Sequence, residues 1–200
     1  MNSNTNDSKL HPVNIEVNDI SGNNQNNAIP DLPNINQELF NRIETMMKKA
    51  FWDKLAEDVK ENNYDSTLKI LQEIAERLCA ITRNRKDFHN EIMERIDIDF
   101  ISQKIKHNAL EPSEIYNIIM FIIQKVINYG TLADEPWNEI WKTQLEVYFN
   151  RNEPLHEIFP KFFKEALHRI EKIELEVNAF KNSEIYKELM KVRKDKQENN

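Results

Sequence analysis

The chain has 200 residues, of which 40% are hydrophobic and 30% charged, so it has the composition of a globular protein with one domain of ordinary size. Its formal net charge of −7 argues against binding to nucleic acid or to an anionic membrane through bulk charge. Two glycines leave few positions for tight hairpin turns, and a single cysteine cannot form an internal disulfide, which disfavours β-sandwiches, barrels and disulfide-rich folds.

The first 36 residues differ from the rest of the chain. They contain eleven asparagines and no aromatic residue. Such a segment buries too little apolar surface to offset the entropy of ordering its backbone, so the sequence predicts a disordered tail over 1–36 and a folded body over 37–196. Residues 13–17 alternate apolar and polar side chains, which leaves open a short strand that adds to the sheet of a partner.

From Gln37 onward, apolar residues recur every three or four positions, which is the spacing of amphipathic helices. The first predicted helix carries one long apolar stripe, formed by Leu39, Phe40, Ile43, Met46, Met47, Ala50, Phe51, Leu55 and Val59. A second helix over 65–81 and a third over 88–96 follow. Asp97 or Asp99 is expected to cap a short fourth helix, because a carboxylate at this position accepts hydrogen bonds from free backbone N–H groups.

A fifth helix begins at Pro112 and is apolar almost all round over 115–127, so it is expected to be the enclosed, central helix. The sixth helix, over 134–148, carries Trp137 and Trp141 on one face, either as core anchors or as interface hot spots. The last helical region starts at Pro154, and Pro160 is expected to kink or interrupt it. The sequence therefore predicts an all-α bundle of about seven helices around a buried central helix.

One face of the last region carries apolar residues at steps of four and three without a miss. They are Phe159, Phe163, Ala166, Ile170, Ile173, Val177 and Phe180. This spacing fits an ordinary long helix that packs on the bundle, and it also fits a coiled-coil seam that pairs with a partner or with a second copy. Both interpretations stay open from the sequence, and the second makes these residues a candidate association seam.

No residue pattern points to catalysis, to a metal or to a cofactor. Two Glu-x-x-His pairs end at His156 and His168, but twelve residues of helix separate them by about 18 Å, too far to share a metal ion. Cys79 is expected to be a small buried thiol, since no signature of an activated nucleophile accompanies it. The beginning of the chain has no basic segment followed by an apolar run, and the longest apolar run is far shorter than a membrane span, which predicts a cytoplasmic protein.

Several short stretches within residues 51–180 resemble a known family, and they follow one another in the same order as in that family. The first are Phe51-Trp52-Asp53-Lys54-Leu55 and, after Asp65, Leu68-Lys69-Ile70-Leu71-Gln72-Glu73-Ile74. The most specific is Asp97-Ile98-Asp99-Phe100-Ile101-Ser102-Gln103, followed by His107-Asn108-Ala109-Leu110; an apolar helix and Glu153-Pro154-Leu155 come later. These stretches resemble the T-complex protein 11 family. The resemblance implies an all-helical, intracellular, non-enzymatic protein that acts through protein partners and is linked to cyclic-AMP and protein kinase A signalling.

The family domain is usually longer, so the resemblance implies a shortened, N-terminal part of it. We therefore expect the 159–180 seam to pair with a second copy or with a partner. The function expected from the sequence is a non-enzymatic interaction module, an adaptor or regulator with a protein partner, possible self-association, and no nucleic-acid or membrane partner. The alternative is a structural or assembly protein, for example of a large DNA virus. An enzyme with a carboxylate–histidine site ranks last.

Overall fold

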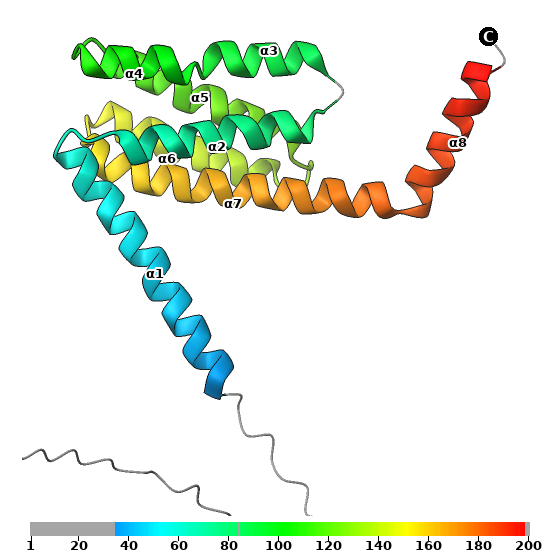
Figure 1. Ribbon diagram of the computed structural model, residues 1–200, viewed down its shortest axis with the longest axis horizontal. Coiled ribbons are helices and arrows are strands. Elements are labelled where there is room, and N and C mark those ends of the chain that lie inside the picture. Colours follow the sequence, from blue (N-terminus) through cyan, green and yellow to red (C-terminus); the bar gives the residue numbers. More distant parts are fainter. Residues whose placement is uncertain (1–34, 84, 199–200) are drawn as a thin grey trace, which may run out of the picture. The chain divides into compact units, whose positions relative to one another are not determined.

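The computed structural model describes residues 35–83 and 85–198, and this part of the chain is all-α, as predicted (Figure 1). Its helices are α1 (Ile35–Lys60), α2 (Asp65–Ile81), α3 (Lys86–Arg95), α4 (Ile98–Lys106), α5 (Pro112–Tyr129), α6 (Glu135–Asn150), α7 (Leu155–Asn182) and α8 (Glu184–Glu198). The eighth helix arises because the last helical region divides at Ser183. The tail predicted for 1–36 lies outside the described residues as far as residue 34.

Local capping explains where two of the helices begin. Asp97 precedes α4 with extended backbone angles, and its carboxylate accepts a hydrogen bond of 2.9 Å from the N–H of Phe100, which selects Asp97 from the two caps that the sequence left open. At the start of α5, the N–H of Glu111 donates to the carboxylate of Glu114 at 3.1 Å, and Pro112 occupies the first turn. These two caps fix the directions of neighbouring helices and so shape the surface between them.

The middle of the bundle is formed by α2 and α5. Figure 1 shows α2 between α3 and α4 on one side and α7 on the other, and α2 packs against all three. The predicted central helix, α5, packs against α6 and α7, and its apolar run over 118–123 lies inside the bundle. None of the helices in the described part of the chain is both long and apolar enough to cross a lipid bilayer.

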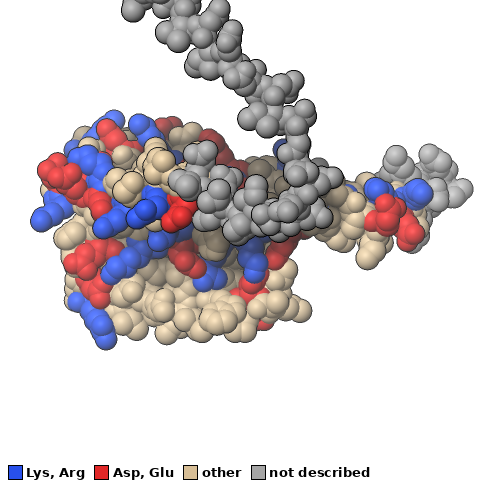
Figure 2. Space-filling view, turned by 90° about the horizontal axis from the view of Figure 1, so that it is seen from below, with Lys and Arg blue, Asp and Glu red and all other residues tan. Residues whose placement is uncertain are grey.

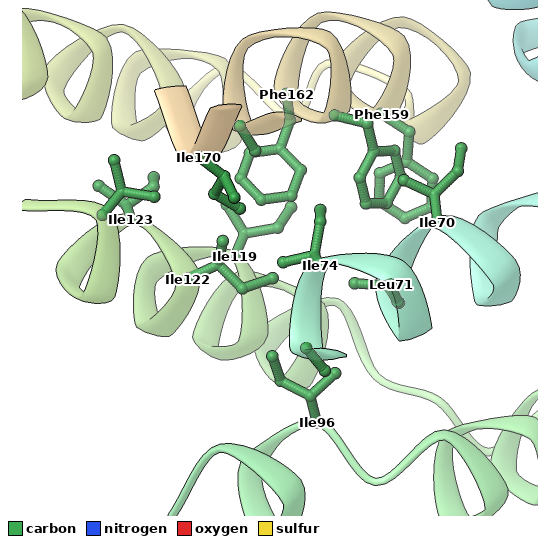
Figure 3. Close-up of a cluster of buried hydrophobic side chains, with 14 of the residues drawn as sticks. Ile70, Leu71, Ile74, Ile96, Ile119, Ile122, Ile123, Phe159, Phe162 and Ile170 are labelled. Carbon is green, nitrogen blue, oxygen red and sulfur yellow. The ribbon is translucent and has the colours of Figure 1, made fainter. Parts of the chain in front are cut away.

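Side chains from α2, α5 and α7 meet in one core (Figure 3). The figure shows Ile74, Ile122 and Phe162 from these three helices pointing toward one another, while Ile96 approaches from the opposite side. All four are fully buried. Burying an aliphatic or aromatic side chain of this size contributes about 1.5–3 kcal/mol relative to leaving it in water, so each of these side chains stabilises the bundle.

The apolar stripe of α1 reaches this core only at its C-terminal end. Leu55 and Val59 are buried in the core cluster. The large apolar residues upstream on the same helix are exposed: Leu39, Phe40, Ile43, Met46, Met47 and Phe51. The apolar stripe is continuous in the sequence, but in the structure it is buried only at the C-terminal end of α1 and exposed along the rest of the helix.

Helix α7 runs through Pro160 without interruption, which corrects the expectation of a break there. Pro160 lies in the second turn, so its ring removes a single backbone N–H from the hydrogen-bond ladder. On either side of it, Phe159 and Phe162 are buried against the core. Their packing outweighs the lost hydrogen bond, because tertiary contacts supply most of the stability of a helix in a protein.

Candidate protein-interaction site

The candidate association seam on α7 is divided between the core and the surface. Its first five members lie in the core: Phe159, Phe163, Ala166, Ile170 and Ile173. Val177 is half-buried and packs against the core, whereas Phe180 is exposed. Another protein can therefore reach only the C-terminal end of the seam without opening the bundle.

The two tryptophans of α6 also have different environments. Trp141 is buried, and its ring stacks on that of Phe162 with the centroids 5.9 Å apart, so it is a core anchor. Trp137, one turn earlier, is exposed. Of the two interpretations that the sequence left open, the core anchor therefore holds for Trp141 and not for Trp137; for Trp137 the interface interpretation stays a prediction.

A polar cavity of about 230 Å³ lies between α6 and α7. Arg169 dominates its wall: the guanidinium donates to the side-chain oxygen of Asn138, lies 2.7 Å from the carboxylate of Glu165 and stands 5.0 Å from the centre of the Trp141 ring. Asn138 is itself buried. Because the guanidinium is already engaged by groups of the chain, we interpret Arg169 as a link between α6 and α7.

The residues considered for chemistry are not assembled into a reactive site. His156 lines a surface depression against α1, and His168 lines the polar cavity, on the same continuous helix. No group of three or more His, Cys, Asp or Glu residues that can hold a metal ion occurs within the described ranges. Cys79 is half-buried, and burial raises the pKa of its thiol, which keeps it in the protonated, weakly nucleophilic form.

A different surface combines apolar and charged side chains in one hollow. A groove of about 260 Å³ lies where α3 ends, α4 begins and α5 passes with its first two turns. Its floor is apolar and consists of Ile101, Leu110 and Ile118. The charged residues around it are Glu94, Arg95, Asp97, Lys104 and Glu114.

Phe100 is the most conspicuous residue of this α3–α5 groove. It is 53% exposed, although an aromatic ring of this size is usually largely buried. Its backbone is held by the Asp97 cap, and the ammonium of Lys104 stands 5.1 Å from the ring centre. Lys104 in turn pairs with Glu114 across the groove. The ring is therefore positioned by its neighbours while one side stays open to water.

The carboxylate of Glu114 is stabilised in its ionised form by its neighbours in the groove. Hydrogen bonds from Lys104 and from the backbone N–H of Glu111 hold the pKa of Glu114 below its usual value, so its carboxylate stays ionised. Over residues 94–114, five acidic residues oppose three basic ones, which gives this segment a net charge of −2. The groove thus offers an apolar floor inside a mildly acidic rim.

Figure 2 shows how charge is distributed over another face of the bundle. Acidic and basic side chains are interspersed there, and an uncharged band runs along the lower edge of the picture. Interspersed charges do not create the extended positive field that attracts a nucleic-acid backbone. On the face in view, surface charge therefore gives no support to a nucleic-acid site.

Fold and groove together define a helical-bundle protein with an open, partly apolar groove between α3, α4 and α5. The family model for T-complex protein 11 matches residues 17–126, which is more than half of the chain, and the chain belongs to this family. The match covers every residue that lines the α3–α5 groove and ends within α5, before α6, α7 and α8. No solved structure matches this fold.

Sequence reasoning recognised the stretch 97–103 but missed the exposure of Phe100. It left Asp97 and Asp99 as alternative caps of the short helix, and the structure selects Asp97. It gave Phe100 no separate role. The signal was available in the spacing, because Ile98, Ile101 and Ile105 share one face of α4 and Phe100 lies off that face. An apolar residue away from the stripe of a short helix is a candidate for binding.

Proposed function

We propose that this protein is a non-enzymatic, intracellular interaction module that binds a segment of another protein in the α3–α5 groove, as an adaptor or regulator. The observation that carries the proposal is Phe100, an aromatic ring held half-exposed beside an apolar floor. Rigidly placed aromatic residues in partly desolvated hollows supply a large share of binding energy in protein interfaces. The groove also lies entirely within the residues that match the T-complex protein 11 family.

The groove suits a helical protein segment as its ligand. Its floor accepts apolar side chains, and its rim carries charges of both signs with an acidic excess. An amphipathic helix binds such a groove by placing side chains at i, i+3, i+4 or i+7 on the floor, while rim charges set its orientation. A basic amphipathic helix is the ligand that this surface matches best.

The family resemblance supports a regulatory role. T-complex protein 11 relatives are linked to cyclic-AMP and protein kinase A signalling, and the family is not known as an enzyme family. We extend that role to this chain as part of the proposal, with the groove as the surface that recognises a signalling partner.

One observation favours the second candidate function, a structural or assembly protein. The exposed residues Phe40, Met47 and Phe51 belong to a continuous apolar face on α1. Contiguous apolar surface of this kind marks sites of association. Under this alternative, copies of the chain assemble with one another and no signalling partner is required.

The test is quantitative mass spectrometry of proteins that co-purify with the full chain from its native cells. We expect a defined set of partners to be lost with Phe100→Glu and retained with Leu132→Glu, which places the same charge on an exposed leucine outside the groove. Recovery of the same partners with both variants would contradict the proposal. Kinase-signalling subunits among the lost proteins favour the regulator; recovery of the chain itself alone favours assembly.

A further inference from the structure

We infer that the helical segment that fits the α3–α5 groove is α8 of a second copy of this chain. The inference rests on the proposed function, because it names an occupant for the same groove. It starts from α8, which carries an exposed apolar face and lies outside the family match.

The exposed apolar residues of α8 have the spacing of helix-in-groove anchors. Ile185, Leu189 and Val192 are 65%, 56% and 53% exposed. They occupy positions i, i+4 and i+7 and therefore form one side of the helix. Three large apolar side chains on one open face of a short helix indicate that the face is covered in the functional state.

The corner between α7 and α8 is a built structure and presents α8 as a separate arm. The hydroxyl of Ser183 accepts a hydrogen bond of 3.2 Å from the N–H of Tyr186 and donates one of 2.6 Å to the carbonyl of Phe180. The rings of Phe180 and Tyr186 also meet edge to face, with centroids 5.5 Å apart. Ser183 thus caps α8, and the ring pair fixes the start of the arm.

Charge distinguishes α8 from the other open helix as the occupant. Helix α8 (Glu184–Glu198) carries a net charge of +1, whereas α1 (Ile35–Lys60) carries none. The charged side chains that line the groove sum to −1. Opposite charge favours α8 in the groove, and the like charges of two α8 helices oppose their pairing with each other.

The arm cannot reach the groove of its own copy. Phe159 of α7 lines a small cavity together with Ile101 and Leu110, which also belong to the groove floor, so Phe159 marks the level of the groove along α7. Ser183 lies 24 residues further on, about 36 Å along a continuous helix. The anchors of α8 extend only about 14 Å beyond Ser183, which is less than half of that distance.

A second copy removes this restriction and makes the contact reciprocal. In a two-fold symmetric pair, each copy places α8 in the groove of the other, so the contact forms twice and the buried area doubles. In this arrangement, the self-association that the sequence suggested for residues 159–180 is made by α8, the helix that follows them. The accessible end of the seam, near Phe180, lies next to α8.

Multi-angle light scattering of the full chain over a range of concentrations tests the inference. We expect a mass that approaches two copies for the wild type and for Leu175→Glu, a change at an exposed leucine of α7 before the corner. Phe100→Glu in the groove and Leu189→Glu on α8 are each expected to weaken self-association roughly 1,000-fold, because each substitution removes a hot-spot contact twice from the symmetric pair. Circular dichroism shows whether each variant remains helical.

A mixing experiment tests whether α8 of one copy binds the groove of the other copy. Phe100→Glu retains an intact α8, and Leu189→Glu retains an intact groove. The mixed pair therefore has one intact contact, whereas a pair of either variant with itself has none, so we expect the two variants to bind each other more tightly than either binds itself. Fluorescence anisotropy of labelled Phe100→Glu, titrated with Leu189→Glu, measures this. The inference is overturned if the wild type keeps the mass of one copy at all concentrations, if Phe100→Glu self-associates like the wild type, or if the mixture shows no binding.

The experiments distinguish a failure of this inference from a failure of the proposed function. If self-association is absent but Phe100→Glu still loses partners in the co-purification experiment, the groove binds another protein and only the α8 inference falls. If Phe100→Glu changes neither self-association nor the co-purified partners, both fall.

Discussion

The apolar stripes of α7 and α1 look alike in the sequence, yet they lie in different environments. On α7, residues such as Phe159 and Ile170 are buried among side chains of α2 and α5. On α1, residues with the same spacing, such as Phe40 and Met47, are exposed, and burial begins only at Leu55. Periodicity shows which side of a helix is apolar; it does not show whether the surface that covers this side belongs to the same chain.

The sharpest test of this difference replaces the same residue type in both regions. Phe162→Ala removes a fully buried ring and is expected to lower the free energy of unfolding by about 3–5 kcal/mol, because it loses apolar burial and leaves a cavity. Phe40→Ala on the exposed part of α1 is expected to change it by less than about 0.5 kcal/mol. Chemical denaturation measures both, and similar losses would show that the α1 face is covered in solution.

A buried charge in the middle of the bundle provides the next test. Lys125 of α5 is buried, and its ammonium lies 2.5 Å from the carboxylate of Glu91 on α3, which is half-exposed. Glu91→Gln leaves that ammonium without its counter-ion and is expected to cost about 2 kcal/mol of stability. Lys125→Met retains the volume without the charge and is expected to stay within about 1 kcal/mol of the wild type. The reverse order in denaturation experiments would contradict this account.

A smaller effect on stability is expected at the start of α4, the helix that carries Phe100. Asp97→Ala removes the cap of α4 and is expected to cost about 1 kcal/mol of stability, because the N–H of Phe100 loses its acceptor. Asp99→Ala is the matched control, since it removes only a favourable charge from the first turn, an effect of about 0.3 kcal/mol. Equal losses in thermal denaturation would show that the carboxylate of Asp97 acts through charge alone.

The smallest expected effect is on the pH dependence of folding stability, through the Lys104–Glu114 pair of the same groove. Lys104 lowers the pKa of Glu114 below its ordinary value of 4.5, so this pair stabilises the fold above pH 4.5 and the contribution is lost as the pH falls further. The difference in unfolding midpoint between the wild type and Glu114→Gln is therefore expected to shrink from pH 6 to pH 3. A difference that stays constant over this range would show that Glu114 acts through packing.

Most of the fold followed from local signals in the sequence. Apolar spacing predicted the helices, the Asp97 cap and Pro112 marked the starts of α4 and α5, and the run over 118–123 identified a helix of the bundle interior. Local signals did not predict the features that depend on packing between distant parts of the chain. Nothing near Pro160 shows that buried rings hold α7 together there, and nothing near Met47 shows that the face it occupies lies in water.

The candidate site was less predictable because it is assembled from three helices. The groove forms only when the end of α3, the face of α4 and the first turns of α5 come together. The family resemblance identified the stretch that contains Phe100, but the exposure of that ring is a property of the packed bundle. Conversely, the seam on α7 has ideal spacing, and most of it is used inside the bundle.

Amide hydrogen–deuterium exchange on dilute full-length protein tests the central claim most directly, because it reports burial and hydrogen-bond protection helix by helix. We predict slow exchange in α5 and in residues 158–173 of α7, and exchange faster by orders of magnitude in residues 41–51 of α1 and in α8. Protection of α1 or α8 as strong as that of α5 in dilute solution would contradict the distinction between covered and open apolar faces.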